Sequence, residues 1–287
     1  MRNFYDLHTH SFYSDGDCSP VIVAKIAKKN NLRGVVLTDH DTILGWQDFF
    51  QTAQVLNFFT VQGIEITSQL FGVDLHILGY SQNFNVAMLS PFLKEARCIA
   101  FQRAQAIARK LKEKNIADLD IETLQRKKGN NAILRKYDIV KTIAFNYVIS
   151  IEQAGKLINN PGDIAYVPHN KKKVLSAKAV IDLIHKANGI AVLAHPGEIA
   201  QKEQNGEKKM LDIIDEMIQL GIDGLEVFSS FHSKKQEKEF LKITKKFKLV
   251  KTGGSDFHGA IHAPKITLGA SGIDEVVWQE FLFKLPK

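Results

Sequence analysis

Cysteine is scarce in this sequence and long hydrophobic runs are missing, and both absences narrow the class of protein. Only two cysteines occur in 287 residues, and Cys18 and Cys98 stand far apart and outside any CxxC pair. This excludes a disulfide framework and a thiolate zinc finger, and it favours a reducing, cytoplasmic environment. No apolar stretch approaches the roughly 20 residues that cross a bilayer, so we expect no membrane association.

Low-complexity segments, linkers rich in proline or glycine and repeats of fixed period are also missing. The start, Met-Arg-Asn, runs directly into a histidine-containing strand, so we expect no cleavable signal peptide. With 45% hydrophobic and 24% charged residues, the chain has the composition of a globular protein with room for a large core. Its formal net charge of +7 favours anionic ligands, although charge alone does not establish a nucleic-acid partner.

Histidine and carboxylate residues occur in this sequence in an unusual arrangement. His8 and His10 follow an apolar-rich start and are separated by one residue, so in a strand both side chains project from the same face. Asp15 lies close behind them. Two imidazoles and a carboxylate are typical transition-metal ligands, but this segment alone fits two solvent-facing histidines equally well.

Nearly every other predicted strand also ends in His, Asp or Glu. The residues concerned are Asp39, His40 and Asp41, Glu65, His76, His195, Glu226, and the pair Asp256 and His258. In a parallel barrel the carboxyl ends of the strands converge on one face, where catalytic groups collect. The pattern therefore predicts a multinuclear site whose His and carboxylate ligands suit Mn, Fe or Zn in a hydrolytic role.

Strands and helices alternate in two separate parts of the chain. The hydrophobic pattern predicts strands at 3–7, 34–38, 58–66 and 73–79 and helices at 20–30 and 43–56. Helices are predicted again at 176–187, 207–220, 233–247 and 274–284. The stretch between carries helical periodicity alone, at 88–113, 120–128, 131–147 and 151–157. We expect this stretch to be a helical insertion in a barrel loop.

Six short motifs, in order along the chain, resemble those of the PHP (polymerase and histidinol phosphatase) family. They are Asp6-Leu7-His8-Thr9-His10 with Asp15-Gly16, Thr38-Asp39-His40-Asp41, Gly63-Ile64-Glu65-Ile66, His76-Ile77-Leu78-Gly79-Tyr80, Ala194-His195-Pro196 and Gly254-Ser255-Asp256-Phe257-His258. The resemblance implies an α/β fold, a distorted (β/α)7 TIM-like barrel built from residues 1–80 and 169–287. Residues 81–168 would be the helical insertion that roofs the active site. The chain looks most like the stand-alone subgroup that hydrolyses 3′,5′-bisphosphonucleotides or trims short RNA from the 5′ end.

The same resemblance implies a specific set of metal ligands. One ion would be bound by His8, His10, Glu65 and Asp256, a second by Glu65, His76 and His195, and a third by Asp15, His40 and His258. Glu65 would therefore bridge two ions. Two or three divalent ions, Mn²⁺ or alternatively Zn²⁺ or Fe²⁺, would activate a bridging hydroxide for in-line attack on phosphorus.

Substrate contacts are predicted at four further positions. His232 is a candidate for a phosphate contact or a proton donor, or else an ordinary loop histidine, and His169 is a similar candidate. Lys171 follows the insertion and is expected at the rim of the site. Arg135 matches an arginine of the subgroup that binds phosphate, for which its fork geometry is suited. The Pro-His pair that follows this arginine in the subgroup is replaced by Lys136 and Tyr137, which leaves the preferred substrate open.

The predicted activity is metal-dependent hydrolysis of phosphate monoesters or diesters of nucleotides, on a bisphosphonucleotide or a short 5′-phosphorylated oligonucleotide. No stable protein partner is predicted. Three alternatives stay open at this point: a histidinol-phosphate phosphatase, a non-catalytic PHP accessory module, and an amidohydrolase that acts on C–N bonds. The retained ligand positions disfavour the accessory module, and Glu65 stands where amidohydrolases typically have a lysine. Fold alone does not decide between these chemistries.

Overall fold

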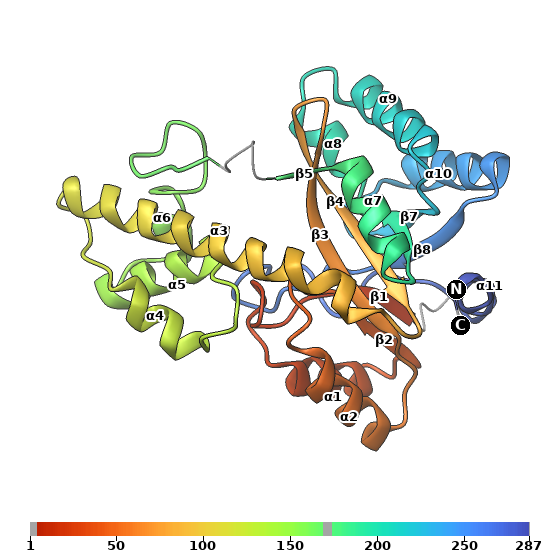
Figure 1. The fold of residues 1–287 in the computed structure, drawn as a ribbon, viewed down its shortest axis with the longest axis horizontal. Coiled ribbons are helices and arrows are strands. Elements are labelled where there is room, and N and C mark those ends of the chain that lie inside the picture. Colours follow the sequence, from red (N-terminus) through yellow and green to blue (C-terminus); the bar gives the residue numbers. More distant parts are fainter. Residues whose placement is uncertain (1–4, 169–173, 287) are drawn as a thin grey trace.

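Eight strands form two sheets in the computed structural model, which describes residues 5–168 and 174–286 (Figure 1). The smaller sheet pairs β1 (Tyr5–Thr9) with β2 (Gly34–Leu37) in parallel, and every residue of both strands is buried. Between and after these strands lie α1 (Pro20–Lys29) and α2 (Trp46–Leu56), which pack side by side. Ser19 begins α1 by accepting a hydrogen bond from the Ile22 amide, as N-cap serines do.

The larger sheet has six strands in the order β5-β3-β4-β6-β7-β8. Their bounds are β3 Gln62–Leu70, β4 Val73–Ser81, β5 Leu175–Ser176, β6 Ile190–Leu193, β7 Gly224–Ser229 and β8 Val250–Gly254. β4 runs antiparallel to β3 and β6, whereas the other pairs are parallel. The reversal arises because β3 and β4 are joined by a two-residue turn, Phe71 and Gly72, both with positive φ, and such a turn leaves no room for a crossover helix.

Isolated bridges connect the two sheets. Thr9 pairs with Phe257 after β8, and His40 pairs with Glu65 on β3. Only single bridges of this kind join the strands of the two sheets, so no continuous ladder closes the sheets among the described residues. The predicted closed barrel is therefore not confirmed, and the structure supports an α/β fold with a mainly parallel central sheet.

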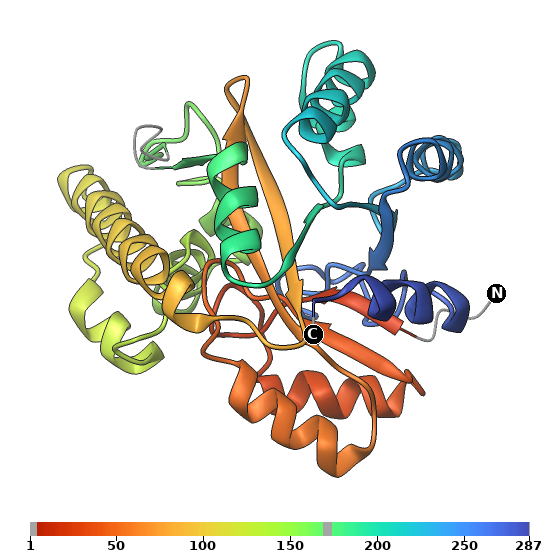
Figure 2. The same ribbon diagram turned by 45° about the vertical axis from the view of Figure 1, so that its right-hand side comes forward.

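Helices surround the strands on the outside, as the view in Figure 2 shows. In the second half of the chain they are α7 (Ala177–Lys186), α8 (Gly197–Lys202), α9 (Gly206–Gln219), α10 (Lys234–Phe247) and α11 (Glu275–Lys284). The largest buried cluster lies between the central sheet and these helices and contains Ile64, Ile77, Val180, Ile213 and Phe240. Burial of such side chains is the main stabilising contribution to the fold.

The predicted insertion is a separate helical layer with a hydrophobic cluster of its own. It comprises α3 (Val86–Glu113), α4 (Ile121–Lys128), α5 (Lys136–Tyr147) and α6 (Ile151–Gly155). The first turns of α3 pack on the sheet through Leu89, while its later turns share a cluster with Leu134, Tyr137 and Ile143. In Figure 1 α3 runs from the sheet outward across α4–α6. No described helix combines the length and apolar character that would let it cross a membrane.

Most predicted elements lie within a few residues of the observed ones, with four differences. The strand predicted at 58–66 begins at Gln62, and the helix predicted at 131–147 begins at Lys136. The second shift follows from Asp138, whose carboxylate accepts the Arg135 amide at 2.8 Å and so begins the helix there. The short elements β5 and α8 were not predicted, because neither is long enough to show periodicity.

Candidate metal centre

The nine predicted metal ligands lie together at one edge of the strands. His8 and His10 come from the end of β1, and Asp15 lies in the loop that follows. His40, His195, Asp256 and His258 follow β2, β6 and β8, whereas Glu65 and His76 lie within β3 and β4. The isolated bridges explain part of this arrangement. The His10 amide donates to Phe257 O at 2.9 Å and the Asp256 amide donates to His8 O at 2.9 Å, so the two ends of the chain place their ligands side by side.

Glu65 lies in the middle of the cluster and is completely buried. Its Oε2 atom lies 3.3, 3.2 and 3.0 Å from ring nitrogens of His8, His10 and His40. Its Oε1 atom lies 3.2 and 3.3 Å from ring nitrogens of His76 and His195. A carboxylate whose two oxygens face two different groups of imidazoles has the arrangement of a bridging ligand.

The two aspartates of the cluster lie close to ring nitrogens of four histidines. Asp256 Oδ1 is 3.2 Å from His8 Nε2 and 3.0 Å from His10 Nε2. Asp15 Oδ1 is 3.3 Å from His258 Nε2, and Asp15 Oδ2 is 3.8 Å from His40 Nε2. Three groups of side chains have donor atoms close enough to share an ion: His8, His10, Glu65 and Asp256; His10, Asp15, His40 and His258; and His40, Glu65 and His76.

Buried polar atoms that lack a hydrogen-bond partner indicate whether these residues suit a metal. Among the described residues, nine buried side-chain nitrogen or oxygen atoms lack a hydrogen-bond partner, and seven belong to this cluster. They include His8 Nε2, both ring nitrogens of His10 and Glu65 Oε2. A buried polar atom without a partner is costly, and here the atoms face one another at distances near 3 Å. Imidazole nitrogens and carboxylate oxygens arranged in this way fit divalent transition metals.

The electrostatics of the cluster keep its carboxylates ionised. Burial alone would raise the pKa of Glu65, but the surrounding histidines, His40 first, hold it well below its usual range. The pKa of Asp256 is held low in the same way, chiefly by His8, despite burial. Burial lowers the pKa of His258, but Asp15 and Asp256 outweigh it and raise that pKa to about 10. Metal binding at such a site would displace protons, as ligation by imidazole requires.

Buried residues behind the ligands hold them in place. Glu226 accepts from His8 Nδ1 at 3.1 Å and from the His195 amide at 2.7 Å. Asp39 accepts from the hydroxyls of Ser11 and Ser14, both at 2.6 Å, and thereby fixes the loop that carries Asp15. Such outer partners orient metal ligands and raise their basicity.

The backbone around the cluster is strained and tightly packed. Three non-glycine residues of the site, Asp41, His195 and Asp256, have positive φ angles of 52°, 25° and 57°. Such conformations cluster at functional sites. A β-carbon at Gly254 would collide with the backbone of His8, so only glycine permits β8 to approach β1 this closely.

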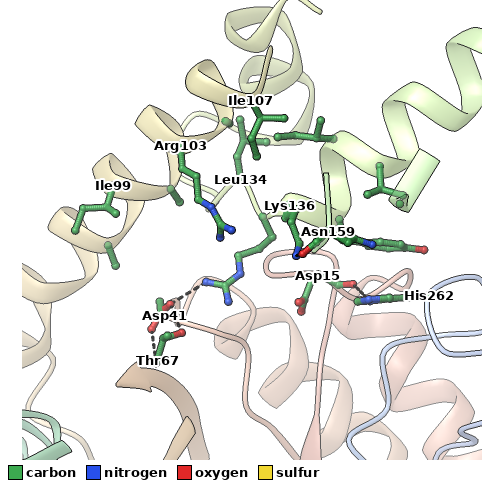
Figure 3. Close-up of a pocket in the computed structure, with 18 of the residues that line it drawn as sticks. Asp15, Asp41, Thr67, Ile99, Arg103, Ile107, Leu134, Lys136, Asn159 and His262 are labelled. Atoms are coloured by element: carbon green, nitrogen blue, oxygen red, sulfur yellow. Dashed lines mark hydrogen bonds and ion pairs between the residues drawn. The ribbon is translucent and has the colours of Figure 1, made fainter. Parts of the chain in front are cut away.

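Beside the cluster a cleft of about 700 Å³ separates α3 from α5 and α6 (Figure 3). Asp15 and Asp41 line its end at the metal ligands, together with Arg135 from the insertion. Arg135 NH1 donates to Asp41 Oδ2 at 2.8 Å, and Asp41 also accepts from the amide and the hydroxyl of Thr67. Asp41 does not cap α2, whose N-cap is Gly45; it ties the insertion to β3.

Four cationic side chains line this cleft, Arg103, Arg135, Lys136 and Lys156, of which Lys156 is ion-paired with Glu152. Lys136 Nζ donates to Asn159 O at 3.0 Å, and Arg103 Nε donates to Val167 O at 3.0 Å. Burial, followed by the nearby positive charge of Arg103, lowers the pKa of Lys136 to about 8. Burial, followed by the charge of Arg135, lowers the pKa of Arg103 to about 10. Like charges crowded together in a partly buried cleft are suited to an anion.

The structure does not support the other predicted substrate contacts to the same extent as Arg135. Both ring nitrogens of His232 face backbone atoms, because Nδ1 lies 2.9 Å from Val227 O and Nε2 accepts the Gly197 amide at 3.1 Å. Burial also lowers the pKa of His232. These contacts favour a neutral histidine that fixes the start of α8, so its role as a proton donor stays a prediction without support from its geometry. His169 and Lys171 lie outside the described residues.

The roles of two residues of the site were not predicted from the sequence. Glu226 was named among the strand-end residues without a specific role, and it lies behind the histidines. Its position as a carboxylate between apolar residues of a buried strand is the signal that indicates such a role. His262 was not among the predicted site residues, yet its Nδ1 lies 2.8 Å from Asp15 O and its ring stacks on Tyr137 with 3.7 Å between centroids. No local pattern indicates this contact between distant segments.

Comparison with known proteins identifies relatives over nearly the whole chain. The chain is 27% identical to a 5′-3′ exoribonuclease of Haemophilus influenzae over 98% of this chain and 100% of that protein. It is 26% identical to a 3′,5′-nucleoside bisphosphate phosphatase of Chromobacterium violaceum over 88% and 86% of the two chains. A solved structure from Bifidobacterium adolescentis, provisionally assigned as a metal-dependent phosphoesterase, has the same fold. It matches with a TM-score of 0.82 and 24% identity over 99% of this chain and 96% of that one.

A family model supplies the remaining comparison. The model of the PHP domain matches residues 6–230, which include seven of the nine predicted ligands. Asp256 and His258 follow this range in sequence, but the bridge between Thr9 and Phe257 brings them to the same cluster. The chain therefore belongs to the PHP domain family.

Proposed function

We propose that this protein is a metal-dependent phosphoesterase that hydrolyses phosphate monoesters or diesters of nucleotides. The observation that carries the proposal is the convergence of six histidines and three carboxylates, whose unpaired atoms face one another beside a cationic cleft. Its substrates would be 3′,5′-bisphosphonucleotides or short 5′-phosphorylated oligonucleotides. The similar exoribonuclease and bisphosphate phosphatase support this substrate class.

The proposed centre holds two or three divalent ions, with Mn²⁺ preferred and Zn²⁺ or Fe²⁺ as alternatives. His8, His10, Glu65 and Asp256 would hold one ion. The other ligand sets would be Glu65, His76 and His195, and Asp15, His40 and His258. When bound, such ions lower the pKa of water and neutralise charge on phosphoryl oxygens.

The chain's own residues supply orientation and charge. Glu65 stays ionised between two groups of histidines, and Glu226 and Asp39 keep the ligands in fixed positions. Arg135, held by Asp41 at the edge of the cluster, is placed to bind a phosphate group of the substrate with its guanidinium fork. Lys136 adds a second cationic contact from the position where the related subgroup has Pro-His.

Two further parts of the proposal concern the architecture. The isolated bridges at Thr9 and His40 would be the seams of a distorted barrel of seven strand–helix units, built from residues 1–80 and 169–287. Residues 81–168 would form the insertion, in agreement with their separate hydrophobic cluster.

The predicted cytoplasmic location rests on the two unpaired cysteines. No protein partner is proposed.

The test is phosphate release by the Mn²⁺-loaded protein from adenosine 3′,5′-bisphosphate and from histidinol phosphate. In parallel, a 5′-phosphorylated RNA trimer is supplied and its mononucleotide products are followed. Preference for the bisphosphate or the RNA is expected. Preference for histidinol phosphate would replace the proposed substrate class with the first alternative. Metal binding with no turnover of any phosphate ester would favour the accessory module or an amidohydrolase.

A further inference from the structure

Two contacts join the helical insertion to the loop between β1 and α1, which carries the proposed metal ligand Asp15. Lys128, the last residue of α4, donates from Nζ to the backbone oxygen of Ser14. The hydroxyl of Tyr137 on α5 donates to Asp17 Oδ1 at 3.0 Å. The insertion therefore contacts this loop at positions before and after Asp15.

Lys128 has an environment that is unusual for a lysine. Its side chain is only 6% exposed and pairs with Asp138, whose side chain is 8% exposed, whereas the neighbouring Lys127 is exposed. The attraction between two buried charges often does not exceed the cost of removing them from water. The ion pair is therefore better explained by a role in fixing a particular arrangement of the chain than by a gain in stability.

Asp138 connects Lys128 to the start of α5. Its Oδ2 atom accepts from Lys128 Nζ and also from the Arg135 amide, the latter at 2.8 Å. Arg135 NH1 in turn donates to Asp41 Oδ2 at 2.8 Å. Asp41 directly follows the proposed ligand His40, so the insertion contacts residues beside two ligands of the same proposed ion.

The third ligand of this ion, His258, is also close to the insertion. The ring of His262 stacks on Tyr137 with 3.7 Å between centroids and meets the ring of His258 edge-on at 4.8 Å. Nδ1 of His262 lies 2.8 Å from Asp15 O, and Figure 3 shows these two residues side by side. All three ligands of one proposed ion thus lie one contact away from the insertion.

We propose that Lys128 and Tyr137 are positioning residues, which hold the loop of Asp15 in place and thereby make binding of the ion at Asp15, His40 and His258 depend on the insertion. This inference rests on the metal centre of the proposed function and adds that the insertion completes it. The other two proposed ions have no ligand in the part of the loop that the insertion contacts, so they bind independently of these two residues.

The experiment is a double-mutant cycle read by equilibrium dialysis with Mn²⁺ and metal analysis, without substrate. Asp15→Asn removes a ligand and is expected to weaken binding of one ion. Lys128→Met removes the ammonium and is expected to weaken one ion about tenfold to a hundredfold, as loss of a partner behind a metal ligand does. Because Lys128 acts through Asp15, adding Lys128→Met to Asp15→Asn should cause no further loss.

Three further variants define the effect. Lys128→Arg keeps a cationic donor for Ser14 O and is expected to bind Mn²⁺ nearly as the wild-type protein does. Lys127→Met changes the exposed neighbour and should leave every ion unaffected. Tyr137→Phe keeps the stacked ring but loses one hydrogen bond, so the same ion should bind about threefold more weakly. This variant leaves no buried charge unpaired, so it tests the inference even if Lys128→Met does not fold, which circular dichroism establishes.

The outcomes separate this inference from the proposed function. A loss confined to one ion and absent from the Asp15→Asn background would support it, even if the wild-type protein hydrolysed no nucleotide. Unchanged Mn²⁺ binding in Lys128→Met and Tyr137→Phe, or in Asp15→Asn, would overturn it, even if nucleotides were hydrolysed. A loss that affects all ions equally, or that adds in full to that of Asp15→Asn, would give Lys128 a general role in the fold and would also overturn it.

Discussion

One carboxylate oxygen of Glu226 lies 3.1 Å from Nδ1 of His8, and both side chains are completely buried. The other oxygen accepts the backbone amide of His195 at 2.7 Å. A single residue of β7 therefore orients one ligand from β1 and another from the end of β6. With Nδ1 of His8 donating to Glu226, its Nε2 is left to face Glu65 and Asp256 as a metal ligand.

Replacing the Glu226 carboxylate is expected to weaken metal binding without removing a metal ligand. We expect Glu226→Gln to lower the affinity for Mn²⁺ about tenfold to a hundredfold, the range typical for partners behind metal ligands. Equilibrium dialysis with metal analysis measures the effect, and Glu280→Gln on exposed α11 serves as the matched control. Unchanged affinity in Glu226→Gln would show that the His8 ring is oriented by other contacts.

Substitution of Glu65 tests the centre itself. Glu65→Gln preserves the shape of the side chain but removes the negative charge that faces five histidines, so turnover should be abolished and bound metal reduced. Turnover and metal content are measured on the same preparation, and circular dichroism is expected to show a retained fold. Near-normal activity would be incompatible with a bridging role for Glu65.

The close approach of β8 to β1 predicts a cost in stability. In Gly254→Ala the added methyl group meets the backbone of His8, and relief requires a shift of a strand that carries two ligands. Overpacking of this kind costs about 1–3 kcal/mol. Urea unfolding of the metal-free protein measures the change, and a loss below about 0.5 kcal/mol would show that β8 moves away without difficulty.

The sequence was sufficient to predict the cluster because strand ends are local features. A short apolar run followed by His, Asp or Glu can be recognised without knowing which strands are neighbours, and the nine ligands that the family resemblance then implied lie together. Recognition of such a run depends only on residues close in sequence.

Contacts between distant segments were beyond the reach of the sequence. The stacking of Tyr137 on His262 and the ion pair of Arg135 with Asp41 join the insertion to the strands, and neither has a signature in its own segment. Closure of the barrel depends in the same way on whether strands of the two sheets pair. The role of Glu226 was not predicted because a buried carboxylate and a substrate-facing one look alike until its partners are known.

Arg135 in the cleft is expected to bind the substrate and to leave metal binding unaffected. Arg135→Ala removes the guanidinium that Asp41 holds beside the cluster, so kcat/KM for adenosine 3′,5′-bisphosphate should fall about tenfold to a hundredfold, because a charge-assisted contact is worth about 1.5–3 kcal/mol. Metal content should stay unchanged. Arg126→Ala, on α4 of the same insertion, is the control. An unaltered kcat/KM in Arg135→Ala would restrict Arg135 to joining the insertion to β3.

Lys136 predicts how substrate affinity depends on pH. Burial and the neighbouring arginines lower its pKa to about 8, well below the usual 10.4 of lysine. The ammonium is charged below this pH and binds phosphate, and it becomes neutral as the pH rises through 8, so the KM for adenosine 3′,5′-bisphosphate should increase between pH 7 and 9.5. Bound phosphate favours the charged form, which moves the midpoint of the increase somewhat above 8.

The matched variant for this prediction is Lys136→Arg. Its guanidinium keeps its charge over the whole range, so the increase in KM should be much smaller, whereas any pH dependence that arises at the metal ligands stays the same in both proteins. The ratio of the two KM values therefore isolates the titration of Lys136. A ratio that is constant from pH 7 to 9.5 would mean that Lys136 does not contact the substrate, and the cationic contact would then be left to Arg103 and Arg135.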